Sequence, residues 1–231
     1  MTTESTTDVT GAPPVRSSAW LDRHLYHSQD GIRIFCGDNR QLAPMLGEYD
    51  LLHTDPPYGI GRDGQKQTTG GNGGRKAYQF MGWDADRPGR AAFDRLLGSV
   101  SHAVIWGGNY YDLPPASQWL VWDKGQRICN SDGELAFSSF DRALRVVEMN
   151  RVELLKEGTI HPTQKPVKLY QWLLANYAVP GQRILEQLED AVVQRRAPDV
   201  QVVARRLEVQ PEGRGIGGGH QRAVPSARSQ V

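Results

Sequence analysis

The sequence predicts an α/β fold with a doubly wound, mainly parallel sheet, and two kinds of pattern support this prediction. An apolar run over residues 49–54 stops abruptly at Asp55-Pro56-Pro57-Tyr58-Gly59, as a buried strand does when it ends in a stiff turn. Amphipathic helices and further strand-like runs follow, over residues 90–101, 103–106, 118–122 and 167–177. Open α/β sheets hold ligands at the carboxyl ends of their strands, so we expect the functional site beside Asp55.

The N-terminal part of the chain begins with a polar tail and then enters the predicted domain. Residues 1–18 contain many Thr and Ser side chains and little apolar periodicity, so we predict that they are disordered. Alternating apolar side chains predict a first strand over residues 31–36. Asp38 follows this strand and is predicted to cap a helix over residues 39–46.

The later elements follow from apolar spacing. A stripe at helical spacing predicts a packing helix over residues 90–101. The strand over residues 103–106 ends at a Gly-Gly turn, and residues 118–122 and 133–137 are predicted as further strands. Pro166 is predicted as the first residue of the last helix, because its missing N–H is one that a helix leaves unpaired. That helix carries the apolar stripe Tyr170, Leu173, Leu174 and Tyr177.

Composition limits the function classes. The 231 residues are 39% hydrophobic, which suffices for the core of a single domain. The 27 basic and 26 acidic side chains leave a net charge of +1, so any affinity for nucleic acid must come from a local patch. Cys36 and Cys129 are too few for a disulfide framework or a zinc cluster, and no metal site is predicted. Without an apolar span or a leader, we expect a cytoplasmic protein with no membrane partner.

The turn after the first buried strand has the chemistry of a nucleobase site. The Asp55 carboxylate and the Pro56 carbonyl only accept hydrogen bonds, which suits an exocyclic amino group. The two prolines limit backbone freedom, and Tyr58 offers a flat ring on which a heterocycle can stack. An ordinary strand-to-loop turn is the alternative for this motif taken alone.

Two motifs together resemble a known enzyme family. Asp55-Pro56-Pro57-Tyr58 resembles the catalytic motif of the DNA amino-methyltransferases, which act on adenine N6 or cytosine N4. The segment Thr159-Ile160-His161-Pro162-Thr163-Gln164-Lys165-Pro166 resembles the HPTQKP segment of the subgroup with the β-type motif order. The resemblance implies a Rossmann-like, S-adenosylmethionine-dependent methyltransferase sheet over residues 19–185.

The resemblance also assigns roles. Asp55, Pro56, Pro57 and Tyr58 are implied as catalytic residues that grip a base extruded from the duplex. The cofactor S-adenosylmethionine is expected to contact Asp38, His161, Thr163, Lys165 and Pro166. At the start of the last helix, His161 and Lys165 are placed to hold the methionine carboxylate of the cofactor. For Asp38, plain helix capping is the alternative.

Contacts with DNA are predicted around the catalytic turn. The glycine-rich stretch of residues 60–77 carries Arg62, Lys66, Arg75 and Lys76, and we interpret it as a mobile cationic flap; a merely solvated insertion is the alternative. Asn109 and Tyr110 are expected to shape the base pocket, or else to form a simple turn. Lys124 is expected to contact a phosphate or the pocket, with an exposed ion pair to Asp123 as the alternative.

The family pattern breaks after Leu185. A glycine-rich cofactor loop is expected there, but the chain runs Glu186-Gln187-Leu188-Glu189-Asp190-Ala191. Residues 186–231 carry no lysine and no aromatic side chain, and we interpret them as an atypical, disordered or non-native segment. We hypothesise a reading-frame slip or gene fusion near Leu185. The sheet is then expected to be incomplete, with an exposed apolar edge.

The predicted function is transfer of a methyl group from S-adenosylmethionine to an exocyclic amine of double-stranded DNA. Adenine N6 is favoured, because a leading Asp is commoner among the adenine enzymes. Cytosine N4 methylation, an inactive remnant that only binds DNA, and an RNA or protein-glutamine methyltransferase are the alternatives. A homodimer is compatible with the resemblance, and a restriction enzyme partner is not indicated by the sequence.

Overall fold

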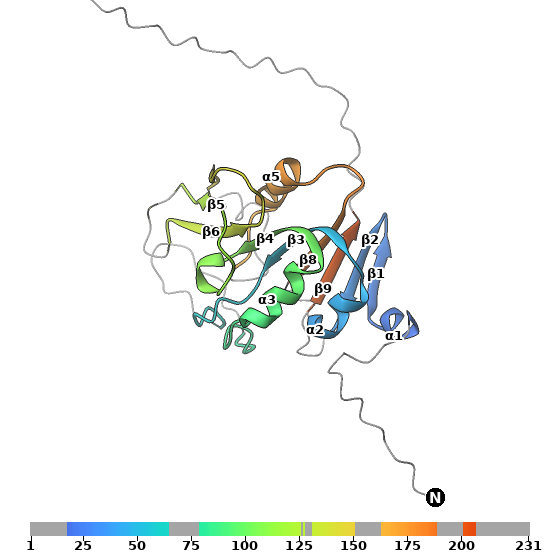
Figure 1. Cartoon of the computed structure of the whole chain (residues 1–231). Helices are drawn as coiled ribbons and strands as arrows, with labels where there is room; N and C mark the ends of the chain where they lie inside the picture. The colour runs from blue at the N-terminus through green and yellow to red at the C-terminus, as the bar shows by residue number, and fades with distance from the viewer. Residues whose placement is uncertain are drawn as a thin grey trace, which may run out of the picture.

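The computed structural model describes residues 18–64, 79–125, 127, 131–150, 163–188 and 201–206, and a mixed sheet of nine strands lies at its centre (Figure 1). Along the sheet the strands lie in the order β1-β2-β9-β8-β3-β4-β6-β5-β7. Within these ranges no helix has the length and apolar character that crossing a membrane requires.

The bounds of the elements are as follows. The strands are β1 (Leu25–Gln29), β2 (Ile32–Cys36), β3 (Tyr49–Asp55), β4 (Val100–Trp106), β5 (Gln118–Asp123), β6 (Gly133–Ser138), β7 (Arg145–Glu148), β8 (Arg183–Leu188) and β9 (Gln201–Arg206). The α-helices are α1 (Ser18–Asp22), α2 (Asn39–Leu42), α3 (Arg90–Leu97) and α5 (Val167–Tyr177), and the 3-10 helices are η1 (Ala43–Met45) and η2 (Gly108–Tyr110).

Most strands of the sheet point the same way. β3 runs parallel to β4 and to β8, and β5 runs parallel to β7. β6 is antiparallel to β4 and β5, and β9 is antiparallel to β8 and β2. The C-terminal ends of β2, β8, β3, β4, β5 and β7 therefore share one edge with the N-terminal ends of β6 and β9. We call it the carboxyl edge.

Helices cover both faces of the sheet. Successive side chains of a strand point to opposite faces, so β3 and β4 contribute side chains to two separate apolar layers. One layer packs against α2 and α3 and contains Leu42, Leu52, Phe93, Ala103 and Ile105. The other packs against α5 and contains Leu51, Val104, Trp106, Leu169 and Leu173. Figure 1 shows α3 and α5 on opposite sides of the central strands.

Several predicted strands are confirmed. The strand that ends at Asp55 is β3, and the run over residues 118–122 is β5, extended to Asp123. The first predicted strand is β2, but β1, which pairs with it in a hairpin, was not predicted. All five residues of β1 are exposed, so its sequence carries no pattern of alternating burial.

Two predicted helices are shorter than their patterns suggest. The helix predicted over residues 90–101 is wrong at its end: α3 stops at Leu97, where the Gly98 N–H closes the last turn on the Asp94 carbonyl. Val100 then begins β4 instead of continuing the helix. The helix predicted over residues 39–46 divides into α2 and η1, and a proline lies in the first turn of η1.

The arrangement of the sheet corrects two further predictions. The sheet is mixed and not mainly parallel, since parallel pairs occur only at β3–β4, β3–β8 and β5–β7 among the described strands. The exposed edge expected after Leu185 is also wrong. β8 continues through the predicted domain boundary to Leu188, and β9 fills the position between β8 and β2. Residues 189–200 and 207–231 lie outside the described ranges.

Candidate active site

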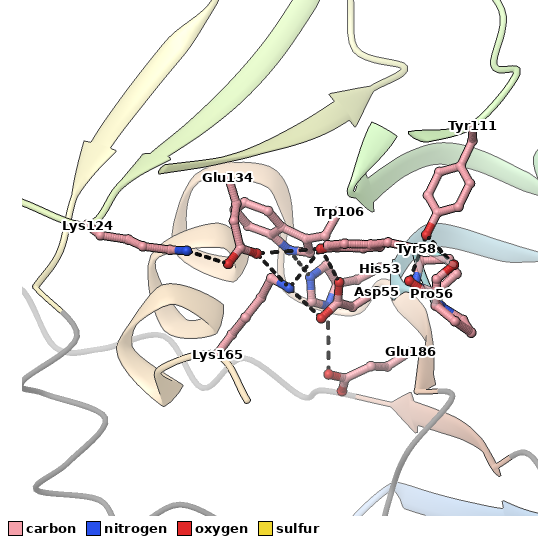
Figure 2. Close-up of polar contacts among 11 residues, drawn as sticks. His53, Asp55, Pro56, Tyr58, Trp106, Tyr111, Lys124, Glu134, Lys165 and Glu186 are labelled. Atoms are coloured by element: carbon pink, nitrogen blue, oxygen red, sulfur yellow. Dashed lines mark hydrogen bonds and ion pairs between the residues drawn. The ribbon is translucent and has the colours of Figure 1, made fainter. Parts of the chain in front are cut away.

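Five side chains from separate parts of the chain meet at the carboxyl edge (Figure 2). Asp55 is the last residue of β3, and Tyr58 lies in the turn that follows it. Lys124 comes directly after β5, Glu134 lies at the start of the antiparallel β6, and Lys165 shortly precedes α5. We call these five residues the Asp55 cluster.

Both oxygens of the Asp55 carboxylate accept hydrogen bonds within this cluster. The Tyr58 hydroxyl donates to Oδ1 at 2.7 Å, and the Lys165 ammonium donates to Oδ2. Lys165 Nζ also donates to the Tyr58 hydroxyl oxygen at 3.2 Å. The Lys165 side chain is 2% exposed, whereas that of Asp55 is 16% exposed. Asp55 therefore lies between a buried cation and the surface.

Glu134 extends the cluster toward β5. Its Oε1 atom lies 2.9 Å from Lys124 Nζ, and its Oε2 atom lies 3.1 Å from Lys165 Nζ and 3.5 Å from the Tyr58 hydroxyl. Cations and anions thus alternate in the order Lys124, Glu134, Lys165, Asp55, and their formal charges cancel. Buried charges are tolerated when each is paired and hydrogen-bonded, as here.

The proton affinities follow from these contacts. Burial would raise the pKa of Glu134, but the charges of Lys165 and Lys124 outweigh it and lower the pKa to about 2. Burial would lower the pKa of Lys165, but Asp55 and Glu134 raise it. Burial, and then the charges of Asp55 and Glu134, raise the pKa of the Tyr58 phenol far above its usual range. At neutral pH Lys165 is therefore a cation and Tyr58 keeps its proton.

Tyr111 holds the turn itself. Its hydroxyl donates to the carbonyl oxygens of Pro56 at 2.6 Å and Pro57 at 3.1 Å. Its ring packs against Phe93 of α3, with centroids 4.8 Å apart. Tyr111, held by its contact with α3, thus fixes the positions of both carbonyl groups.

Aromatic rings surround Tyr58. The Tyr110 ring stacks on it, with centroids 4.9 Å apart and an interplanar angle of 16°. Gly107 lies against the same ring: a Cβ atom there would be 2.2 Å from Tyr58 Cε1. Gly107 has φ 68°, in the left-handed region that favours glycine, so this close approach depends on the absence of a side chain.

A buried polar pair lies beneath the cluster. Trp106 Nε1 donates to His53 Nε2 at 2.9 Å, which leaves the His53 proton on Nδ1, 3.7 Å from Glu186 Oε1. Lys165 Nζ lies 5.4 Å from the centre of the Trp106 ring and 5.7 Å from that of Tyr58. Two aromatic rings thus flank the buried ammonium, an arrangement that favours the cation.

Two buried aspartates fix the ends of the glycine-rich stretch. Asp84 accepts hydrogen bonds from the main-chain N–H groups of Gly59 at 2.7 Å and Arg62 at 2.6 Å. Asp63 accepts from the N–H groups of Met81 at 2.9 Å and Trp83 at 3.1 Å, and from that of Gly82. The two ends of the described chain on either side of residues 65–78 therefore lie close together, beside the turn that follows Asp55.

The alternative predicted for Lys124, an exposed ion pair with Asp123, is wrong. Lys124 is buried and pairs with Glu134, which places it in the Asp55 cluster beside the predicted base pocket. Asp123 instead accepts hydrogen bonds from Arg127, at 2.8 and 3.0 Å. These bonds, together with the Gly125 N–H, lower the pKa of Asp123 to about 2.

Other predicted site residues are placed as follows. Tyr110 lies beside the catalytic turn, and Asn109 is exposed on η2. Arg62 is half-buried and its main chain is held by Asp84. Asp38 follows β2 at the carboxyl edge, but β9 and β8 lie between β2 and β3. The predicted residues His161, Lys66, Arg75 and Lys76 lie outside the described ranges.

Three of the residues predicted to contact S-adenosylmethionine, Thr163, Lys165 and Pro166, lie just before α5 in the described part of the chain. Lys165 was predicted to hold the carboxylate of the cofactor, but the three N–H groups of this ammonium meet Asp55, Glu134 and Tyr58. Pro166 is buried and caps α5 instead of starting it, and Thr163 is half-buried. The nucleobase half of the predicted site is therefore better defined than the cofactor half.

Sequence reasoning missed Tyr111 and the role of Glu134. No role was predicted for Glu134 from the sequence, and Tyr111 only adjoins Tyr110, which was predicted to shape the base pocket. Their partners lie 55 and 76 residues away in the chain, so no local pattern could reveal them.

Comparisons with known proteins found no relative of this chain. The chain matched no protein-family model, and searches of curated proteins and of solved structures also found no match. Function is therefore inferred from the fold, the contacts and the two motifs.

Proposed function

We propose that this protein is a DNA amino-methyltransferase that modifies an exocyclic amine, with adenine N6 favoured. The observation that carries the proposal is the ion pair between Asp55 and Lys165. These residues belong to the two motifs that resemble the family, they are 110 positions apart, and they are in direct contact. A chance match of two short motifs gives no reason for such a contact.

The Asp55 turn is suited to an amino group. A carboxylate offers about four lone-pair positions, and Tyr58 and Lys165 occupy two of them. The Pro56 carbonyl accepts one bond from Tyr111 and has a second lone pair. Asp55 and Pro56 can therefore each accept one hydrogen of an –NH₂ group while the turn stays anchored.

The aromatic pair is suited to the ring of the base. The Tyr110 ring covers one face of the Tyr58 ring. A nucleobase that stacks on this face must enter between the two rings, so Tyr110 has to move outward. Both residues then line the slot, and stacking on each ring contributes about 1–3 kcal/mol. Asn109, exposed on the same short helix, would move with Tyr110.

The residues act on the amine as follows. Its nitrogen is a poor nucleophile because its lone pair conjugates with the ring. When Asp55 and the Pro56 carbonyl hold the two hydrogens, the lone pair turns out of the ring plane and can form the new N–C bond. One amine hydrogen leaves as a proton, which the Asp55 carboxylate accepts. S-adenosylmethionine is the methyl donor that the resemblance implies; its S–CH₃ bond would break as the N–C bond forms, and S-adenosylhomocysteine would be the leaving group.

Methylation of DNA tests the proposal. Purified protein, S-adenosylmethionine and bacterial chromosomal DNA free of methylated bases are incubated, and nucleosides are quantified by mass spectrometry. We expect N6-methyladenine, and a loss on the order of 100-fold or more in Asp55→Ala. Asp112→Ala, which removes a carboxylate that is 75% exposed, is the matched control and should keep the activity. Absence of both N6-methyladenine and N4-methylcytosine would overturn the proposal.

A DNA-binding remnant without methyl transfer is the second candidate. It is favoured by β9, which lies beside β8 near the position expected for the cofactor loop. Calorimetry with S-adenosylmethionine separates the two candidates. Binding without DNA supports the enzyme, and no binding at millimolar cofactor supports the remnant.

A further inference from the structure

Lys165 is more deeply enclosed than any partner in its cluster. Its side chain is 2% exposed, against 9% for Lys124, 16% for Asp55 and 23% for Glu134. Its three contacts reach the two carboxylates and the phenol between them. A buried ammonium aimed at acceptors on two different strands fixes their relative positions.

We propose that Lys165 is a positioning residue that holds the Asp55 carboxylate oriented toward the amine, and that Glu134 balances the charge of Lys165. This inference rests on the proposed function, because it gives Asp55 a catalytic task. It assigns to Lys165 a role different from the cofactor contact expected from its motif.

Removal of Lys165 has a defined electrostatic consequence. Tyr58 would then lie between two carboxylates, 2.7 Å from Asp55 Oδ1 and 3.5 Å from Glu134 Oε2, with Lys124 in contact with Glu134 only. Without the cation between them the two carboxylates repel each other, so the pair takes up its first proton at a higher pH. A protonated Asp55 no longer accepts the amine proton.

The other ionisable groups nearby do not replace Lys165. Tyr111 faces the carbonyls of Pro56 and Pro57, and its hydroxyl is neutral. His53 and Glu186 form their own pair below Trp106. Within the described part of the chain, Lys165 is the cation recorded in contact with Asp55.

The experiment compares Lys165→Met with Lys124→Met. Both changes remove one lysine from the cluster, but only the first removes the partner of Asp55. Methylation rate is measured from pH 5 to pH 9. In Lys165→Met the acid side of the profile should move up by about one pH unit or more, a loss of about fivefold or more at the pH of the former midpoint. In Lys124→Met it should stay within a few tenths of a unit.

A second measurement needs neither cofactor nor DNA. Carboxyl ¹³C NMR follows protonation of the Asp55–Glu134 pair in the unaltered protein and in both variants. The first protonation should occur at a higher pH in Lys165→Met than in Lys124→Met. Equal titration in the two variants would overturn the inference even if DNA is methylated.

Two further results of these experiments would also decide the inference. If Lys165→Met does not fold, the double variant with Glu134→Gln removes one charge of each sign and is used instead. Its acid side should lie at a higher pH than that of the unaltered protein, and a profile identical to that of the unaltered protein would overturn the inference. A clear NMR shift with no methylation by the unaltered protein would overturn the proposed function and, with it, the catalytic role of this contact.

Discussion

Single residues at this site are constrained by contacts that leave no spare volume. Gly107 is the clearest case, because its backbone lies in the left-handed region and the Tyr58 ring occupies the place of a side chain. Gly61 has nearly the same φ, 69°, but among the described residues no atom lies within 4 Å of a Cβ built there. A comparison of substitutions at Gly107 and Gly61 therefore separates the effect of backbone strain from that of steric exclusion.

We therefore expect Gly107→Ala to lower the free energy of unfolding by about 2 kcal/mol more than Gly61→Ala does. Both variants strain the backbone by about 1–2 kcal/mol, and only Gly107→Ala also forces the Tyr58 ring to move. Urea unfolding at neutral pH measures the difference. Equal losses would show that the Tyr58 ring shifts freely, and would argue against a fixed base slot.

Glu134 gives a prediction about pH. Its pKa falls from 4.5 to about 2 on folding, so it stabilises the fold at a pH above 4.5, and this stabilisation is lost as the pH falls toward 2. The shift corresponds to about 3 kcal/mol at most. In Glu134→Gln the difference in unfolding free energy from the unaltered protein should shrink between pH 7 and pH 3. A difference independent of pH would contradict the ion pairs drawn in Figure 2.

At the scale of elements, local apolar patterns located several of the strands but did not show which strands pair with one another. The run that ends at Asp55 and the stripe on α5 could be predicted because alternating burial and helical spacing are properties of neighbouring residues. The end of α3 was misplaced because Val100 fits the helical stripe, although Gly98 ends the helix and Val100 starts β4. Periodicity alone does not show where an apolar residue changes from one element to the next.

The candidate site shows the same division. The acceptor turn was predicted from four consecutive residues, whereas the contacts of Lys165 and Lys124 depend on strand order. β6 lies between β4 and β5 and runs against them, which brings Glu134 to the carboxyl edge. No sequence pattern indicated this reversal, so Lys124 was wrongly paired with its neighbour Asp123.

For the whole molecule, the decisive feature is β9. It pairs in register with β8 on one side and with β2 on the other, and it joins the β1–β2 hairpin to the rest of the sheet. Residues 186–231 were interpreted as a disordered or non-native replacement, yet six of them close the gap in the sheet. Residues 186–188 and 201–206 are therefore part of the sheet, whatever the origin of the segment.

A shortened chain tests this role of β9. A chain that ends at residue 188 leaves the facing edges of β8 and β2 without their partner, and unpaired strand edges favour aggregation. We expect a clearly lower urea midpoint, rapid amide exchange throughout β2, and association on size-exclusion chromatography. A chain that ends at residue 206 keeps β9 and is the matched control, with a midpoint equal to that of the full chain. If the chain ending at residue 188 were as stable and as protected in β2 as this control, β9 would have no structural role. The sheet would then be complete without it.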